Sequence, residues 1–372
     1  MTTSPGVIQG LLERELETAH LQRAVDHSGH GLGRVIVVEG PAGIGKTALV
    51  GAARELAREA GMNVRAARGA EFEQSFAFGG VRQLLDPLLA SASESQRSEW
   101  LSGAAELAAP LFEARAALSA LGRDSIYPRL QGLYWLCSNL AREQPLALCL
   151  DDAQWADEPS LAFLGFLARR LEELPILLLV AARLPILSAP EGLATLLGDP
   201  AARLLRPRGL SVKGVEQMLT RQLGDDVEAR FVATCHAVTG GNPFLLHELA
   251  VELEAAGIEP LAINAAQIGA LGPRCVANAV LARLGQLAPD AGRLAHAVAI
   301  LGDGASLTDA ANLAGIDPHH GSPRRRRHAH RRSARRRGRA GFRAPTDPRR
   351  DLSERAHRRT RAASRGSRAS AQ

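Results

Sequence analysis

The 372-residue chain contains few lysines, few aromatic residues and few cysteines. Only two of its 45 basic residues are lysine, Lys46 and Lys213, and aromatic residues make up 4% of the sequence. No apolar run approaches the roughly 20 residues that a membrane-spanning helix needs, so we expect no membrane association. The four cysteines are widely spaced in apolar surroundings, which favours buried thiols over a metal site or a set of disulfides. We therefore expect a cytoplasmic protein whose core consists of leucine, alanine, valine and isoleucine.

The net charge of +6 hides two unlike parts of the chain. Residues 324–372 contain 19 arginines and three acidic residues, a net charge of +16, which leaves −10 for the rest. Such an arginine-rich segment cannot bury a core. It could bind nucleic acid or another polyanion weakly by releasing counterions, or it could be the product of a reading-frame change in a GC-rich gene. The abrupt change near residue 318 and the mixture of Arg, Ala, Pro, Ser and Gly favour the frame change.

A glycine-rich segment, GPAGIGKT, follows an apolar strand expected over residues 34–39 and precedes a helix expected from residue 48. It fits the phosphate-binding P-loop pattern G-x-x-x-x-G-K-[ST] at every fixed position. The residues that we expect to bind a nucleoside triphosphate are Gly40, Pro41, Ala42, Gly43, Ile44, Gly45, Lys46 and Thr47. A glycine-rich turn without a ligand would explain the glycines, but it would not explain the Lys-Thr pair.

The chemistry of this segment suits a polyphosphate with its metal ion. Glycines let the backbone wrap an anion and direct several N–H groups at it. Lys46 adds a compact ammonium that can reach between the β- and γ-phosphates, and the Thr47 hydroxyl can bind Mg²⁺. Because the chain uses arginine for almost every other cation, a lysine at this position indicates that a compact ammonium is needed there.

Two acidic residues, Asp151 and Asp152, end the apolar segment that begins at residue 146. Open α/β sheets bind ligands at the carboxyl ends of their strands, so Asp151 would hold Mg²⁺ there through water. Asp152 would orient or deprotonate the attacking water. Its side chain is one methylene shorter than a glutamate, which favours slow hydrolysis. The alternative is a pair of acids that caps the following helix.

Arg183 directly follows another apolar strand, expected over residues 176–182. We expect that strand to lie between the P-loop strand and the Asp151 strand, so that Arg183 faces the γ-phosphate. An arginine there can sense the triphosphate and stabilise charge during transfer, which would make it a catalytic residue beside Asp152. A solvated arginine at a strand end is the alternative.

Apolar strands alternate with helices in the first half of the chain, which predicts an α/β fold with a parallel sheet covered by helices on both faces. Helical patterns alone follow. We predict four parts: a P-loop nucleotide-binding domain over residues 1–206, an all-helical lid over 207–287, a partial winged helix over 288–318 and a disordered tail over 319–372. Within the lid, the segment from Gly240 to Phe244 has the pattern of one helix end and the next helix start.

Four segments together resemble one family: GPAGIGKT, LALCLDDAQWAD, the strand with Arg183 in LLLVAARLP, and TGGNPFLLHEL. In this order and spacing they are similar to the signal-transduction ATPases with numerous domains (STAND), whose ATPase is of the AAA+ class, and among these to the large LuxR-type transcriptional regulators. The resemblance covers about residues 7–317. It implies that Asn242 and Pro243 contact the nucleotide from the lid. At Glu13 the chain departs from the Gly-Arg-Glu segment that the family usually has near the adenine.

The resemblance also implies a mechanism and partners. ADP with Mg²⁺ would hold a closed resting form, and exchange for ATP with an unknown inducer or regulatory protein would open it toward self-association. Slow hydrolysis would reset this switch in signal transduction or transcription regulation. The family's helix-turn-helix output domain is not recognisable, so we expect no dedicated DNA-binding domain in this chain. The alternatives are a DNA-associated AAA+ ATPase that uses the arginine-rich tail, and a truncated remnant without output.

Overall fold

The computed structural model describes residues 11–113, 126–183, 191–224, 226–268, 289–301 and 306–316. The chain divides into two compact units, Met1–Val276 and Ala277–Gln372. The predicted tail over 319–372 lies outside the described residues, and so does the end of the predicted lid, residues 269–287. None of the helices that the structure describes is long and apolar enough to cross a membrane.

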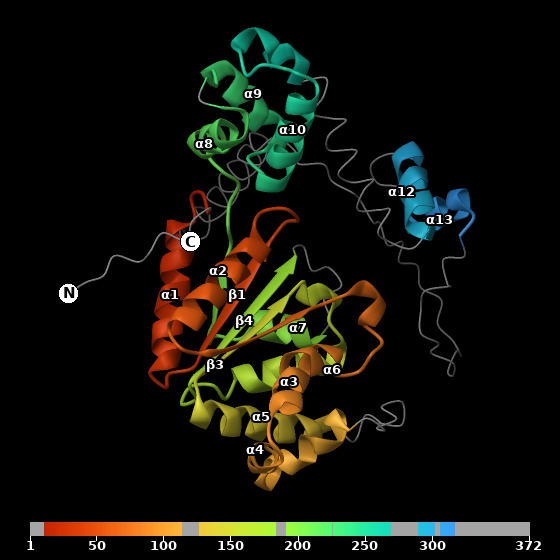
Figure 1. Cartoon of the computed structure of the whole chain (residues 1–372). Helices are drawn as coiled ribbons and strands as arrows, with labels where there is room; N and C mark the ends of the chain where they lie inside the picture. The colour runs from red at the N-terminus through yellow and green to blue at the C-terminus, as the bar shows by residue number, and fades with distance from the viewer. Residues whose placement is uncertain are drawn as a thin grey trace, which may run out of the picture. The chain divides into compact units, whose positions relative to one another are not determined.

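A five-stranded parallel sheet forms the centre of the first unit (Figure 1). Its strands, in spatial order, are β2 (Asn63–Arg68), β3 (Leu146–Asp151), β4 (Ile176–Arg183), β1 (Arg34–Gly40) and β5 (Ala202–Leu205). All four neighbouring pairs are parallel. β4 lies between β1 and β3, as the sequence predicted. The register pairs Gly40 with Arg183 and Arg68 with Asp151, so the ends of four strands meet at one edge.

Helices cover both faces of the sheet, because successive side chains of each buried strand point to opposite faces. In β4, Leu177 and Leu179 pack into one core, while Leu178 and Val180 pack into the other. The first core is covered by α1 (Glu15–Gly29) and α2 (Lys46–Glu59). The second is covered by α3 (Gly79–Ser91), α4 (Glu94–Trp100), α5 (Ile126–Glu143), α6 (Glu158–Ala168) and α7 (Glu191–Leu197). The predicted α/β fold is confirmed.

Three local features differ from the expectation. The short strand β5 was not predicted, because four residues are too few to carry a pattern of buried positions. The sequence pattern over residues 99–121 predicts a helix with a break at Pro110, but α4 ends at Trp100 and Gly103–Phe112 forms a 3₁₀-helix. Pro87 is expected from the sequence to break the helix over residues 76–89, but it lies inside α3 and does not end it, since the buried leucines on both sides of the proline hold the helix against the core.

Three helices, called the lid from here on, follow the sheet within the first unit (Figure 1). They are α8 (Val212–Leu223), α9 (Ala229–Thr239) and α10 (Pro243–Ala255). The lid has its own apolar core, in which Leu219, Phe231 and Leu249 are fully buried. Short 3₁₀ turns complete this unit at Glu71–Glu73 (η1), Ala153–Trp155 (η5) and Ala262–Asn264 (η6).

The described part of the second unit consists of α12 (Pro289–Leu301) and α13 (Leu307–Ala314). The Ser306 hydroxyl accepts a hydrogen bond from the Asp309 N–H at 3.0 Å and so caps the start of α13. The assignment of this part to a partial winged helix stays a prediction, as do the domain boundaries proposed from the sequence.

Candidate functional site

The turn between β1 and α2, residues 40–46, is called the cradle from here on. Gly43 and Gly45 have φ angles of 80° and 102°, in the left-handed region that glycine enters without strain. α2 begins at Lys46, so the positive end of its dipole lies at the turn. The Lys46 side chain is buried, and its Nζ donates to the carbonyl oxygens of Gly40 and Pro41 at 2.9 and 2.8 Å. The ammonium is therefore held inside the cradle.

Thr47 and Asp151 meet at the same edge of the sheet. The Thr47 hydroxyl donates to Asp151 Oδ2 at 2.8 Å, and Asp151 Oδ1 accepts from the N–H of Asp152 at 2.9 Å. Oxygen donors of this kind suit Mg²⁺. Among the described residues, no group of three or more His, Cys, Asp and Glu side chains is placed to hold a metal ion. A Mg²⁺ ion held by the Thr47–Asp151 pair would need further oxygen ligands, which bound water could supply.

The carboxylate of Asp152 is held by three side chains. Arg68 donates to its Oδ2 from Nε at 3.0 Å and from Nη2 at 2.8 Å. Gln154 donates to Oδ1 at 3.0 Å, and Arg183 Nη2 lies 3.6 Å from the same oxygen. Asp152 itself is buried and has a left-handed φ of 49°.

These contacts set the proton affinity of Asp152. Burial alone would raise its pKa, but hydrogen bonds from Arg68 and Gln154 and the charge of Arg183 lower the pKa below its ordinary value. An ionised, paired carboxylate is a weak base. Sequence reasoning missed Arg68, although it ends strand β2 as Arg183 ends β4, and the same signal would have found it.

The turn before α10 lies directly on the P-loop. Asn242 caps α10, because its Oδ1 accepts from the N–H groups of Phe244 and Leu245. Its Nδ2 donates to the Ala42 carbonyl at 3.0 Å, and the Phe244 N–H donates to the Gly43 carbonyl at 3.3 Å. A Cβ on Gly43 would lie 2.7 Å from the Phe244 Cβ. Glycine is therefore needed at position 43 for space as well as for its φ.

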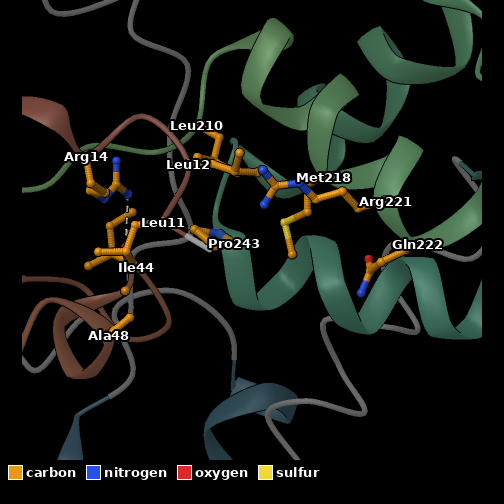
Figure 2. Close-up of a pocket in the computed structure, with 11 residues that line it drawn as sticks. Leu11, Leu12, Arg14, Ile44, Ala48, Leu210, Met218, Arg221, Gln222 and Pro243 are labelled. Carbon is orange, nitrogen blue, oxygen red and sulfur yellow. Dashed lines mark hydrogen bonds between the residues drawn. The ribbon is translucent and has the colours of Figure 1, made fainter. Parts of the chain in front are cut away.

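An apolar pocket of about 320 Å³ lies beside the P-loop, between the lid and the segment before α1 (Figure 2). Its apolar lining residues include Leu11, Leu12, Ile44, Ala48, Leu210, Met218 and Pro243. A flat heterocyclic base fits such a lining next to a phosphate cradle. Of these residues, sequence reasoning named Ile44 and Pro243; the others come from segments too far apart in the chain for a local pattern to join them.

Cys137, Cys149 and Cys235 are buried free thiols. Burial raises the pKa of each to about 12, so these thiols stay protonated and act as small apolar side chains. Cys275 lies outside the described residues.

The structure thus brings the predicted site residues to one edge of the sheet. Direct contacts join Thr47 to Asp151 and Arg183 to Asp152, and Asp151 accepts from the N–H of Asp152. Lys46 lies on the turn that follows β1, the strand next to that of Arg183. The predicted lid turn contacts the P-loop from the other side. The site therefore combines a glycine-rich turn, a pair of oxygen-bearing side chains and an apolar pocket.

Residues 10–180 match the family model of the AAA ATPase domain. This match covers the P-loop, Asp151 and Asp152, and it ends within β4, before Arg183 and the lid. The match therefore spans β1, β2, β3 and the first part of β4, and does not reach β5. No curated protein matches the chain significantly.

Several solved structures are similar to this chain, among them the following three. One is a STAND protein with a tetratricopeptide repeat sensor from Pyrococcus horikoshii, with 17% identity and a TM-score of 0.40 over 66% of this chain and 32% of that one. Another is the ORC1 protein of Aeropyrum pernix in complex with DNA, with 17% identity and a TM-score of 0.46. The match covers 82% of this chain and 77% of that one. The third is the RuvB Holliday junction branch migration motor of Thermotoga maritima, with 15% identity and a TM-score of 0.43. The match covers 84% of this chain and 85% of that one. The chain spans about a third of the length of the first.

Replacing Gly43 by alanine should separate the lid turn from the P-loop. The new methyl group would collide with Phe244 and would strain the φ of 80°, so we expect a loss of about 1–3 kcal/mol in the free energy of unfolding. Gly51→Ala is the matched control, because a Cβ added at Gly51 would have no atom within 4 Å and alanine favours helix α2 by about 0.5–1 kcal/mol. Denaturant unfolding measures the free energy of unfolding of both variants. The same free energy change in Gly43→Ala and Gly51→Ala would contradict the contact between Gly43 and Phe244.

Proposed function

We propose that this protein binds ATP and ADP with Mg²⁺ and acts as a nucleotide-dependent regulatory switch with slow ATP hydrolysis. The observation that carries the proposal is the closure of the lid turn on the P-loop, through Asn242 on Ala42 and Phe244 on Gly43. A ligand in the cradle lies next to a contact between two parts of the protein, so its presence can change how the two parts fit together.

Each part of the nucleotide has a counterpart in the site. The residues from Gly40 to Lys46 would hold the phosphates, and the apolar pocket would hold the base. Thr47 and Asp151 would hold the metal ion, which when bound neutralises charge on the phosphates. Asn242 and Pro243 would contact the nucleotide from the lid, since Pro243 lines the pocket and Asn242 bonds the P-loop.

Slow hydrolysis follows from the state of Asp152. A base that activates water needs a free lone pair and a pKa near the working pH. Asp152 has its oxygens engaged by Arg68 and Gln154, and its pKa is lowered. Arg183, 3.6 Å from the same carboxylate, would exchange this partner for the γ-phosphate. Turnover would then require a rearrangement of this cluster, which suits a switch.

The switch acts by linkage between nucleotide and conformation. A nucleotide shifts the balance between closed and open forms only by its difference in affinity for them. The motifs resemble those of the STAND ATPases and of LuxR-type transcriptional regulators, so we extend the proposal to a cytoplasmic role in signal transduction or transcription regulation. An inducer or regulatory protein and nucleotide-dependent self-association belong to this proposal.

The first test replaces the P-loop lysine. Lys46→Ala removes the ammonium from the cradle and should abolish the thermal stabilisation by ATP, which at a hundredfold excess over its dissociation constant amounts to about 2.7 kcal/mol. Lys213→Ala, which removes the other lysine, from an exposed position on α8, is the matched control and should keep the full shift. Stabilisation of Lys46→Ala equal to that of the wild type would refute the site.

The second test concerns the acidic pair. Asp152→Asn keeps the size of the side chain but cannot accept the proton of a water molecule, so the variant should bind ATP and lose turnover. Turnover is measured as phosphate release from ATP with Mg²⁺ present, and ATP binding is measured separately on the same variant. Persistent turnover in the variant would remove Asp152 from the role of base.

The third test releases Asp152 from its partner. Arg68→Gln removes the cation that lowers the pKa of Asp152, so the carboxylate becomes a stronger base and turnover should rise on the order of fivefold. Arg65→Gln, on the same strand β2, is the control and should leave turnover unchanged. A decrease or no change in Arg68→Gln would show that this arginine does not restrain hydrolysis.

A further inference from the structure

Glu13 has a backbone conformation that its residue type does not favour. Its φ is 55°, in the left-handed region, where a side chain crowds the backbone. Glycine, asparagine and aspartate enter this region more readily than glutamate. Such a conformation persists when other contacts hold it in place. The contacts that hold Glu13 are those of its side chain and of its neighbour Arg14.

The carboxylate of Glu13 lies at the start of the first lid helix. It accepts from the N–H of Ser211 at 2.7 Å and from the Ser211 hydroxyl. Ser211 is the residue that caps α8, since its hydroxyl accepts from the Gly214 N–H at 3.2 Å. The positive end of the α8 dipole favours a carboxylate at this place. Glu13 therefore extends the cap of a helix that lies about 200 residues away in sequence.

The fit at this contact is close. A Cβ on Gly214 would lie 2.6 Å from Glu13 Cδ, so the helix surface accepts the carboxylate because position 214 has no side chain. Burial alone would raise the pKa of Glu13, but hydrogen bonds from Ser211 and Gly214 and the charge of Arg14 lower the pKa below its ordinary value. Glu13 is thus ionised at neutral pH where it meets the helix.

Arg14 connects the same segment to the P-loop. Its guanidinium is buried and donates from Nη2 to the Ile44 carbonyl at 3.1 Å (Figure 2). The same Nη2 donates to the Arg208 carbonyl at 2.7 Å. Two adjacent residues therefore join three parts of the protein: Arg14 holds the P-loop and the segment that leads to the lid, and Glu13 holds the lid helix. Leu11 and Leu12, just before them, line the apolar pocket.

We infer that Glu13 is a positioning residue for the nucleotide: through Ser211 it holds α8 against the segment 11–14 and so keeps the apolar pocket closed around a base. This inference rests on the proposed function for the ligand, but the contact itself does not depend on it. Glu13 does not line the pocket and acts through the position of Leu12 and Met218 on its two walls. Loss of the contact shifts the protein toward an open lid, and the binding affinity falls with the population of the closed form.

The test measures the affinity of the full-length chain for a fluorescent ADP analogue with Mg²⁺. Glu13→Gln and Ser211→Ala should each weaken binding about fivefold to tenfold, the effect of losing one hydrogen bond of ordinary strength. The double variant should be weaker than either single variant by less than the sum of the two effects, since the hydroxyl bond that Ser211→Ala removes is part of the contact that Glu13→Gln weakens. Glu216→Gln, exposed on the same helix α8, is the control and should bind as the wild type does.

A second variant separates positioning from stability. Glu13→Gly relieves the left-handed backbone and should unfold at a higher temperature than Glu13→Gln, yet it should bind the ADP analogue as weakly, because it also lacks the carboxylate. A purely structural role predicts that affinity follows stability. Wild-type affinity in Glu13→Gln or Glu13→Gly would overturn the inference.

Hydrogen exchange of α8–α10 without nucleotide distinguishes this inference from the proposed function. Faster exchange in Glu13→Gln than in Glu216→Gln supports the contact, and equal exchange overturns it. If the wild-type chain does not bind the ADP analogue, the proposed function fails, and the exchange result alone decides on Glu13. If the wild type binds and Glu13→Gln binds equally well, the positioning role fails while the proposed function stands.

Discussion

The absence of a side chain at Gly43 is the constraint on which the rest of the site depends. Its left-handed φ shapes the P-loop, and its bare Cα lets Phe244 and Asn242 lie on the loop. The same residue thus shapes the turn and leaves room for the lid turn to contact it. Because one small surface serves both purposes, a ligand in the cradle and the lid turn cannot be independent of each other.

Charge at the edge of the sheet is arranged so that each group has a partner within the protein. Lys46 bonds two carbonyl oxygens of its own loop, Thr47 bonds Asp151, and Asp152 is held by two arginines. Under the proposed function, phosphates and a metal ion would compete for these same groups. Binding would then exchange one set of contacts for another, which is a physical basis for two alternative states of one site.

Local patterns in the sequence predicted much of this arrangement. The P-loop, the strand ending at Asp151 and the strand ending at Arg183 each carry a run of apolar residues followed by a chemically distinct one, and their order in the sheet was predicted correctly. β5 and the apolar pocket were missed. The pocket joins Leu12, Ile44 and Met218, and the Glu13 contact joins residues about 200 positions apart, so neither leaves a local pattern. Glu13 departs from the glycine of the resembling family, yet it keeps the left-handed conformation that glycine favours.

The central claim is that the P-loop and the lid turn form one nucleotide-dependent unit. Hydrogen exchange of the wild-type chain, with and without ADP and Mg²⁺, tests it most directly. The account predicts that residues 42–47 and 240–246 become protected together, over the same range of ADP concentration. Protection of the P-loop without the lid turn, or of neither, would contradict it.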